Sequence, residues 1–258
     1  MRARTNPYAG RYIVSKIAKT RAITANPLIR GHIPETKSMN KESLHRMLHK
    51  HKMVYIKPNS GTFGNGVMRV EWNERDPSSP YHYQNGTRKK RFGSFHTMYT
   101  AIRKDMTRKN YLVQKGIHLL KYRGNRFDIR VMVQQSPNRK WETTGIIGRV
   151  AHPQKIVTNF HNGGKLMPVE TLLAGYLSRD NKQRYIHKLK KLGLQVAKAM
   201  HVKYKKIKEI GLDVAVENDL KPWILEVNTS PDPYIFRRLK DKRIFQKIYR
   251  YAKAYKRI

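Results

Sequence analysis

The order of apolar and polar residues predicts an alternation of short strands and amphipathic helices. The segments MVYIKP (53–58) and YLVQKGI (111–117) are short apolar runs that predict strands. The segment from 179 to 204 places its apolar side chains on one stripe and predicts a long amphipathic helix. In total, strands are expected at 53–58, 66–72, 111–117, 127–135, 141–151, 211–218 and 222–228, and helices at 40–51, 94–106 and 179–204.

Several of these strands follow one another closely enough to form hairpins. Asn85–Gly86 favours a type I′ turn within the segment 81–92. The segment SPNRK (136–140) joins two expected strands, and NDLK (218–221) joins the last two. Antiparallel pairs of strands with helices between them indicate an α+β fold.

The tail, residues 234–258, mixes apolar and basic residues. Its apolar positions fall near helical spacing, so we expect a helix that packs on the body of the protein and has a basic outer face. A helix that binds nucleic acid or a membrane surface is the alternative.

The charge of the chain is extreme. Its 258 residues include 55 Lys and Arg against 17 Asp and Glu, a formal net charge of +38. Such a surface attracts phosphates, nucleic acids or acidic polymers at long range, and the attraction weakens with salt. A solvated surface with incidental affinity for polyanions is the alternative interpretation.

Composition excludes several classes of protein. No run approaches the roughly 18 apolar residues that a membrane helix needs, and the basic N-terminus lacks the apolar stretch of a secretory signal. The absence of Cys excludes disulfides, thiol catalysis and Cys-based zinc sites, and it is consistent with a cytoplasmic protein.

A glycine loop lies between two of the expected strands, in YIKPNSGTFGNGVMRV (55–70). Glycines there let backbone N–H groups approach a ligand and point at phosphate oxygens. The loop is neither a P-loop nor a Rossmann fingerprint, because a strand and not a helix is expected after it. A plain hairpin loop is the simpler explanation, but Lys57 ends an apolar strand just before it and needs an anion to neutralise it. A nucleotide phosphate would provide one.

Glu226 is the second unusual charge, because it stands among the apolar residues of WILEVNTSP (223–231). A carboxylate there is costly unless a positive group meets it, and either a salt bridge or a metal ion would serve. Glu226 and Asn228 lie two apart on a strand and therefore point to the same face. Asp213, on the partner strand of the expected hairpin, can face them.

Seven segments in this order resemble the ATP-grasp superfamily and, more narrowly, its spore-coat-associated YheC/YheD group. They span most of the chain and are IPET (33–36), YIKPNSGTFGNGVMRVE (55–71), LVQKGI (112–117), FDIRVMVQ (127–134), TNFHNGG (158–164), GLDVAV (211–216) and WILEVNTSPD (223–232). The resemblance implies two α+β lobes with a nucleotide bound between them. We expect the first lobe at 1–118 and the second, with the metal site and the basic C-terminal helix, at 119–258.

The resemblance also implies which residues bind ATP. Lys57 matches a lysine that contacts the nucleotide phosphates, and the loop 60–66 matches the lid over them. Lys16 is our choice for the earlier lysine of this clamp, with Lys19 as its competitor. Residues 114–117 match the hinge between the two lobes, whose backbone is expected to meet the adenine edge. The expected nucleotide-binding residues are Lys16, Lys57, Ser60, Gly61, Thr62, Gly64, Gly66, Gln114, Lys115, Gly116, Ile117 and Asn159.

In the same family pattern, Asp213, Glu226 and Asn228 match ligands of magnesium. Mg²⁺, or Mn²⁺ in its place, prefers hard oxygen donors and keeps phosphates and waters in its shell. Arg130 and Arg149 match arginines that meet the triphosphate or a developing acyl phosphate, a role that suits a planar and always charged group. Asn159, Gly163 and Gly164 match a loop near the γ-phosphate, and His161 is a weaker candidate acid or base.

The function that the resemblance implies is an ATP-dependent ligase that joins a carboxylate to an amine through an acyl phosphate and releases ADP. Lys57, Arg130, Arg149 and the metal would position and neutralise the reacting groups. A kinase-like phosphotransfer is one alternative. A non-catalytic, spore-associated protein that binds nucleic acid or another polyanion is the other.

The substrates are open at this point. A basic groove suits an anionic acceptor such as an acidic peptide or polymer. Few residues precede Lys16, so we expect a partner, a second copy or a polymer to complete the acceptor site. We expect a cytoplasmic protein from the composition, and the family group adds a possible association with spores.

Overall fold

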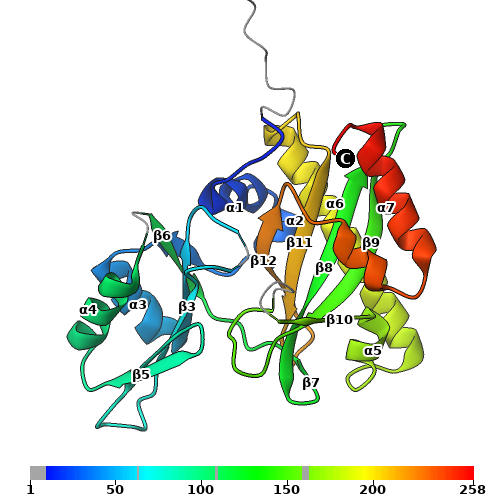
Figure 1. Cartoon of the computed structure of the whole chain (residues 1–258). Helices are drawn as coiled ribbons and strands as arrows, with labels where there is room; N and C mark the ends of the chain where they lie inside the picture. The colour runs from blue at the N-terminus through cyan, green and yellow to red at the C-terminus, as the bar shows by residue number, and fades with distance from the viewer. Residues whose placement is uncertain (1–9, 63, 108–109, 159–162) are drawn as a thin grey trace, which may run out of the picture.

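The computed structural model describes residues 10–62, 64–107, 110–158 and 163–258 and contains two sheets of six strands each (Figure 1). The first sheet has the strand order β1-β6-β2-β3-β4-β5. The second has the order β10-β9-β8-β11-β12, with β7 paired to β8. All pairs are antiparallel, which is the arrangement that hairpins and short connections allow. The α+β fold is therefore confirmed.

The first lobe is a sheet covered by two helices. Its core lies between the sheet and these helices, where Leu44, Met47 and Leu48 of α3 meet Val54 and Ile56 of β2. Its elements are β1 (Thr36–Ser38), α3 (Lys41–His51), β2 (Met53–Pro58), β3 (Met68–Trp72), β4 (Tyr81–Asn85), β5 (Arg88–Phe92), α4 (Phe95–Asp105) and β6 (Tyr111–Lys115).

The second lobe is covered on both faces of its sheet. The long helix α6 packs on one face, and the C-terminal segments η2 and α7 pack on the other (Figure 1). Its elements are β7 (Lys121–Tyr122), β8 (Asn125–Gln135), β9 (Trp141–Val150), β10 (Lys165–Met167), α5 (Val169–Leu173), α6 (Arg179–Lys203), β11 (Glu209–Val216), β12 (Pro222–Asn228), η2 (Tyr234–Arg238) and α7 (Lys242–Ala254).

The two N-terminal helices, α1 (Lys16–Thr24) and α2 (Pro27–Arg30), pack on the second lobe. Ile23 of α1 and Ile29 of α2 are buried in the same core as β8 and α6. The expected boundary at 118 placed these helices with the first lobe. The division into lobes stays a proposal, and their packing assigns both helices to the second.

Two local expectations are wrong. Asn85 pairs with Arg88, so the turn residues of that hairpin are Gly86 and Thr87. Gly86 has a positive φ of 60°, and Thr87 does not have a positive φ. A type I′ turn needs a positive φ at both positions, so the pattern is that of a type II′ turn.

The tail is also not one helix. It begins with η2, becomes extended at Leu239, and restarts where the Asp241 side chain accepts from Arg243 N.

Asn40 is confirmed as the N-cap of α3 and provides a test of this local structure. Its side chain accepts from Ser43 N at 2.7 Å, and its own N–H donates to Ser43 Oγ at 3.0 Å. We expect Asn40→Ala to lower the free energy of unfolding by about 1 kcal/mol, measured by urea denaturation. Asn40→Asp keeps an acceptor at the cap and is the control. An alanine variant as stable as the aspartate variant would contradict the prediction.

In the described part of the chain, none of the helices has both the length and the apolar character that crossing a membrane requires.

Candidate functional site

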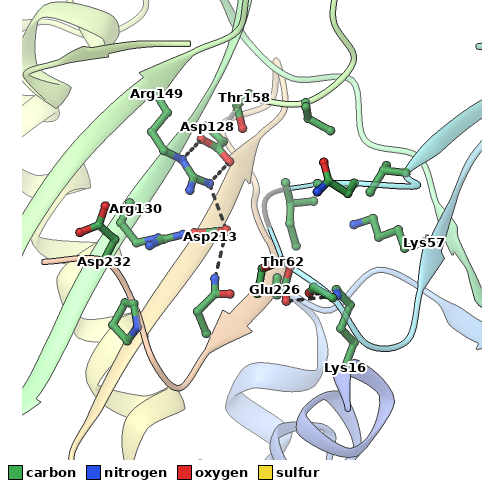
Figure 2. Close-up of a pocket in the computed structure, with 18 of the residues that line it drawn as sticks. Lys16, Lys57, Thr62, Asp128, Arg130, Arg149, Thr158, Asp213, Glu226 and Asp232 are labelled. Carbon is green, nitrogen blue, oxygen red and sulfur yellow. Dashed lines mark hydrogen bonds and ion pairs between the residues drawn. The ribbon is translucent and has the colours of Figure 1, made fainter. Parts of the chain in front are cut away.

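A cavity of about 510 Å³ opens between the two lobes (Figure 2). One wall comes from β2 and the glycine loop, and the other from β8, β9, β11 and β12. Most of the residues that the sequence singles out lie in these walls: Lys16, Lys57, Gly61, Thr62, Gly64, Gln114, Lys115, Ile117, Arg130, Arg149, Asp213, Glu226 and Asn228. Ser60, Gly66 and Gly116 do not line the cavity. Asn159 and His161 lie outside the described residues.

A buried cluster of carboxylates and arginines forms the floor of the cavity. Phe127, Ile129 and Val131 of β8 face the helical core, so the alternating Asp128 and Arg130 face the cavity. The ladder sets Asp128 opposite Arg149 and Arg130 opposite Asp213. Asp128 stands two residues before Arg130 in the sequence, but nothing local indicates its pairing with Arg149, because that pairing depends on strand register.

The side chains of this cluster are in close contact and are almost fully buried. Arg149 Nε donates to Asp128 Oδ1 at 2.8 Å, and its Nη2 lies 3.0 Å from Asp213 Oδ2. Arg130 Nε donates to Asp213 Oδ1. Burial alone would raise the pKa of Asp213, but the charges of Arg130 and Arg149 outweigh it and lower this pKa to about 2. Asp213 is therefore a fixed negative charge at neutral pH.

Glu226 meets two lysines from the N-terminal helix. Its Oε1 lies 3.6 Å from Lys19 Nζ and 3.7 Å from Lys16 Nζ. A bulge of β12 at Leu225 sets Glu226 opposite Asp213, while Ile224 and Val227 remain in the helical core. The salt bridge that the sequence left as one explanation is thus present. Both lysines belong to α1 and precede Glu226 by about two hundred residues in the sequence. Only the fold brings them close to Glu226.

The three proposed metal ligands present oxygen atoms to one part of the cavity. Asn228 Nδ2 donates to Gly211 O at 3.4 Å and to Asp213 Oδ2 at 3.3 Å, which leaves Asn228 Oδ1 as an acceptor. The contacts of Glu226 are longer than ordinary hydrogen bonds, so its carboxylate can exchange a lysine for a cation. Asp213 would share its oxygens with the arginines. The described residues contain no group of three His, Asp or Glu that would hold a metal alone, so a hard cation here needs oxygens from a bound ligand.

Lys57 faces this acidic wall from the first lobe. Its Nζ donates to Gln114 Oε1 at 2.6 Å, and Gln114 Nε2 donates to Thr36 Oγ1 at 3.0 Å. Burial lowers the pKa of Lys57 to about 8, and Glu226 offsets part of that effect. In this state a neutral amide meets the ammonium group, so an anionic ligand would be a better partner. Sequence reasoning missed the role of Thr36, although it lies in the IPET segment.

Hydrogen bonds connect the glycine loop to α1. Lys16 Nζ donates to Gly61 O at 2.9 Å, and the backbone N–H groups of Lys16 and Ile17 donate to Asn59 O and Oδ1 at 2.9 and 3.0 Å. Gly61 and Gly64 have φ of 127° and 73°, which other residues rarely adopt. Lys16, and not Lys19, therefore reaches the loop and the main cavity. Sequence reasoning missed Asn59, whose polar side chain in a loop gave no signal.

The hinge supports only part of the expected adenine contact. The N–H groups of Lys115 and Gly116 already donate to Glu35 O and Met53 O at 2.8 and 2.9 Å. Gln114 turns its side chain toward Lys57. Ile117 and Leu119 line the cavity and are apolar enough to contact a purine ring. An N–H contact from this part of the hinge to adenine would therefore have to come from Ile117.

Comparison with known proteins identifies relatives of the chain. Residues 5–258 match the family model described as YheC/D like ATP-grasp. The endospore coat-associated protein YheD of Bacillus subtilis (strain 168) is 28% identical over 195 residues, which are 72% of this chain and 41% of that protein. YheC of the same organism is 22% identical over 225 residues, 87% of this chain and 61% of that protein. The chain thus spans about half the length of these curated relatives.

Two solved structures are similar to the chain. A carboxyaminoimidazole ribonucleotide synthase from Asperigillus clavatus, solved in complex with ATP, superposes with a TM-score of 0.50 at 11% identity and covers 85% of this chain and 45% of its own. The ATP-grasp ligase PsnB, solved with a minimal precursor, has a TM-score of 0.48 at 13% identity, over 85% of this chain and 53% of its own. Taken with the two-lobed fold and the match over nearly the whole chain, the family model shows that this protein belongs to the YheC/D-like ATP-grasp family.

Proposed function

We propose that the cleft binds ATP together with a divalent cation, and that the protein uses this ATP to join a carboxylate to an amine. The observation that carries the proposal is the pairing of two opposed walls. Lys57 presents its ammonium group from the first lobe, and Lys16 presents its own from α1, between the glycine loop and Glu226. Asp213, Glu226 and Asn228 present oxygens from the sheet of the second lobe. A polyphosphate between them would satisfy the lysines directly and the carboxylates through a cation.

In the proposed reaction, an oxygen of the substrate carboxylate attacks the γ-phosphorus of ATP, and ADP leaves. The amine nitrogen then attacks the acyl carbon of the resulting acyl phosphate, inorganic phosphate leaves, and the nitrogen loses a proton. Lys57 and Lys16 neutralise the phosphate oxygens. When bound, the cation would neutralise the charge that builds up on the phosphates.

The two arginines of the cluster have different proposed roles. Arg149 is 4% exposed and is held by Asp128 and Asp213, so we assign it to positioning Asp213. Arg130 contacts Asp213 through Nε and lines the cavity, so its remaining N–H groups are the ones that can meet a phosphate or acyl phosphate.

Calorimetry of ATP binding with and without Mg²⁺ tests the site directly. We expect wild-type protein to bind ATP more tightly with Mg²⁺, and Glu226→Gln to lose about 10- to 100-fold of that enhancement, because one oxygen ligand loses its charge. Glu74→Gln is the matched control, since Glu74 pairs with Lys52 on the surface. If both proteins fold but neither binds ATP, the proposal is wrong.

The ligase chemistry has its own test. Incubation with ATP, a set of carboxylates and hydroxylamine should release ADP and phosphate and trap the acyl phosphate as a hydroxamate. AMP as the product would exclude this reaction. A phosphorylated substrate without trapped hydroxamate would favour kinase-like phosphotransfer.

A further inference from the structure

The segment formed by η2 and α7 carries an excess of positive charge that its own surroundings do not neutralise. Residues 234–258 contain ten Lys and Arg and a single acid, Asp241. Ion pairs account for Arg243 with Asp241, Lys247 with Glu142, and Arg257 with Glu209. No ion pair to a described residue accounts for the other cations, which are Arg237, Arg238, Lys240, Lys242, Arg250, Lys253 and Lys256.

Aromatic rings run through the same surface. Tyr234, Phe245 and Tyr249 form a row with ring centroids 6.0 and 5.7 Å apart. Arg237 lies over the ring of Phe245 at 5.6 Å, and Lys253 lies over that of Tyr249 at 5.0 Å. These contacts hold two cations beside the row. We call this surface, Tyr234, Arg237, Phe245, Tyr249 and Lys253, the aromatic–basic row.

The aromatic–basic row begins at the mouth of the cleft. Tyr234 lines the cavity, and the residue is 45% exposed. Figure 1 shows η2 and α7 on the face of the second sheet that is opposite α6. A chain that follows the row therefore has one end at the cleft.

The packing of α7 argues against a lipid partner. Its apolar stripe is buried against the second sheet, since Ile248 and Ala252 are 0% exposed. The side chain of Ile248 belongs to a core cluster with Met132, Ile147 and Phe236. An interfacial membrane helix must present its apolar face to the lipid. The face that α7 presents is basic, so the membrane alternative raised by the sequence is not supported.

We propose that the aromatic–basic row binds single-stranded nucleic acid. A cationic surface with interleaved aromatic rings matches the two features of such a strand, a phosphate at each step and a base with a flat apolar face. An acidic peptide would use the cations of the row alone and would make no use of the exposed ring of Tyr234. The proposal does not rest on nucleotide binding in the cleft.

Fluorescence anisotropy with a labelled 12-residue oligothymidylate, measured over a range of salt concentrations, tests the row. We expect Arg237→Gln/Lys253→Gln to weaken binding by about tenfold and to flatten the slope of log K against log salt by about 1.4, or 0.7 for each lost phosphate contact. Tyr234→Ala should weaken binding at least about fivefold without changing the slope, because it removes stacking and not charge.

The matched control is Lys190→Gln/Lys191→Gln, which removes two exposed charges from α6 on the opposite face of the sheet. It should bind the oligonucleotide like the wild type. Equal weakening by both double variants would show that net charge alone attracts the strand, and would overturn the proposal.

A 12-residue polyglutamate tests the alternative partner, an acidic peptide. The proposal is wrong if this peptide binds as tightly as the oligonucleotide and its binding is weakened equally by Tyr234→Ala. The Arg237→Gln/Lys253→Gln variant should still bind ATP as the wild type does, which separates this test from that of the cleft.

Discussion

Replacing Arg149 by methionine is expected to lower the free energy of unfolding by about 3–5 kcal/mol, measured by urea denaturation. Arg149 neutralises Asp128 and Asp213 at once, and the Asp128 and Arg149 side chains are 2% and 5% exposed. Methionine fills much of the same volume but leaves both carboxylates with less positive charge in a dry site. The cost is therefore that of a buried charge without its partner, and not that of a cavity.

Surface pairs provide the control for this prediction. Arg46→Met removes an arginine from an (i, i+4) pair with Glu42, whose side chains are 62% and 73% exposed. It should cost no more than about 0.5 kcal/mol. Adding Asp213→Asn to Arg149→Met should restore part of the lost stability. If Arg149→Met and Arg46→Met unfold at the same urea concentration, the cluster does not stabilise the fold as argued.

The stability of the two proteins should also depend on pH to different degrees. In the wild type the folded pKa of Asp213 is about 2, below the ordinary value of 3.8, so its contribution is present above pH 3.8 and is lost as pH falls toward 2. In Arg149→Met the folded pKa of Asp213 should lie closer to the ordinary value, because Arg130 alone then opposes the effect of burial. The stability difference between the two proteins should therefore shrink as pH falls.

Local sequence patterns predicted much of the fold, because most elements here obey local rules. The apolar stripe of α6, the cap at Asn40 and the strands β2, β8, β9, β11 and β12 follow from residue periodicity and composition. The exceptions have local causes as well. Thr87 disfavours the positive φ of a type I′ turn, and Asp241 restarts the helix in the tail.

The candidate site was less predictable, because its contacts join distant segments. Lys57 and Glu226 could be singled out as charges in apolar strands, which is a local anomaly. Their partners could not be found in this way. Asp128 meets Arg149 through strand register, Lys16 and Lys19 reach Glu226 through the packing of α1, and Asn59 ties the loop to that helix. No periodic pattern encodes these pairings.

If the cleft binds a nucleotide as proposed, the burial of Lys57 should make that binding weaker as pH rises. With a pKa of about 8 in the free protein, Lys57 loses its proton as pH rises through this value, and the neutral amine no longer attracts phosphate. We expect the dissociation constant for ATP, measured by calorimetry at constant ionic strength, to rise about tenfold between pH 7 and pH 9. The phosphates of ATP are already ionised over this range.

Two variants separate Lys57 from the other groups of the cleft. Lys57→Arg keeps its charge at every pH of the experiment, so binding should lose the dependence attributed to Lys57 even if its affinity is lower. Gln114→Leu removes the amide oxygen that accepts from Lys57 Nζ at 2.6 Å, which disfavours the charged form and should move the loss of binding to lower pH. A Lys57→Arg profile identical to that of the wild type would place the titration elsewhere, with Lys19 as the next candidate because burial lowers its pKa as well. A flat wild-type profile would mean that Lys57 remains charged throughout, and that Glu226 and the amide of Gln114 compensate its burial fully.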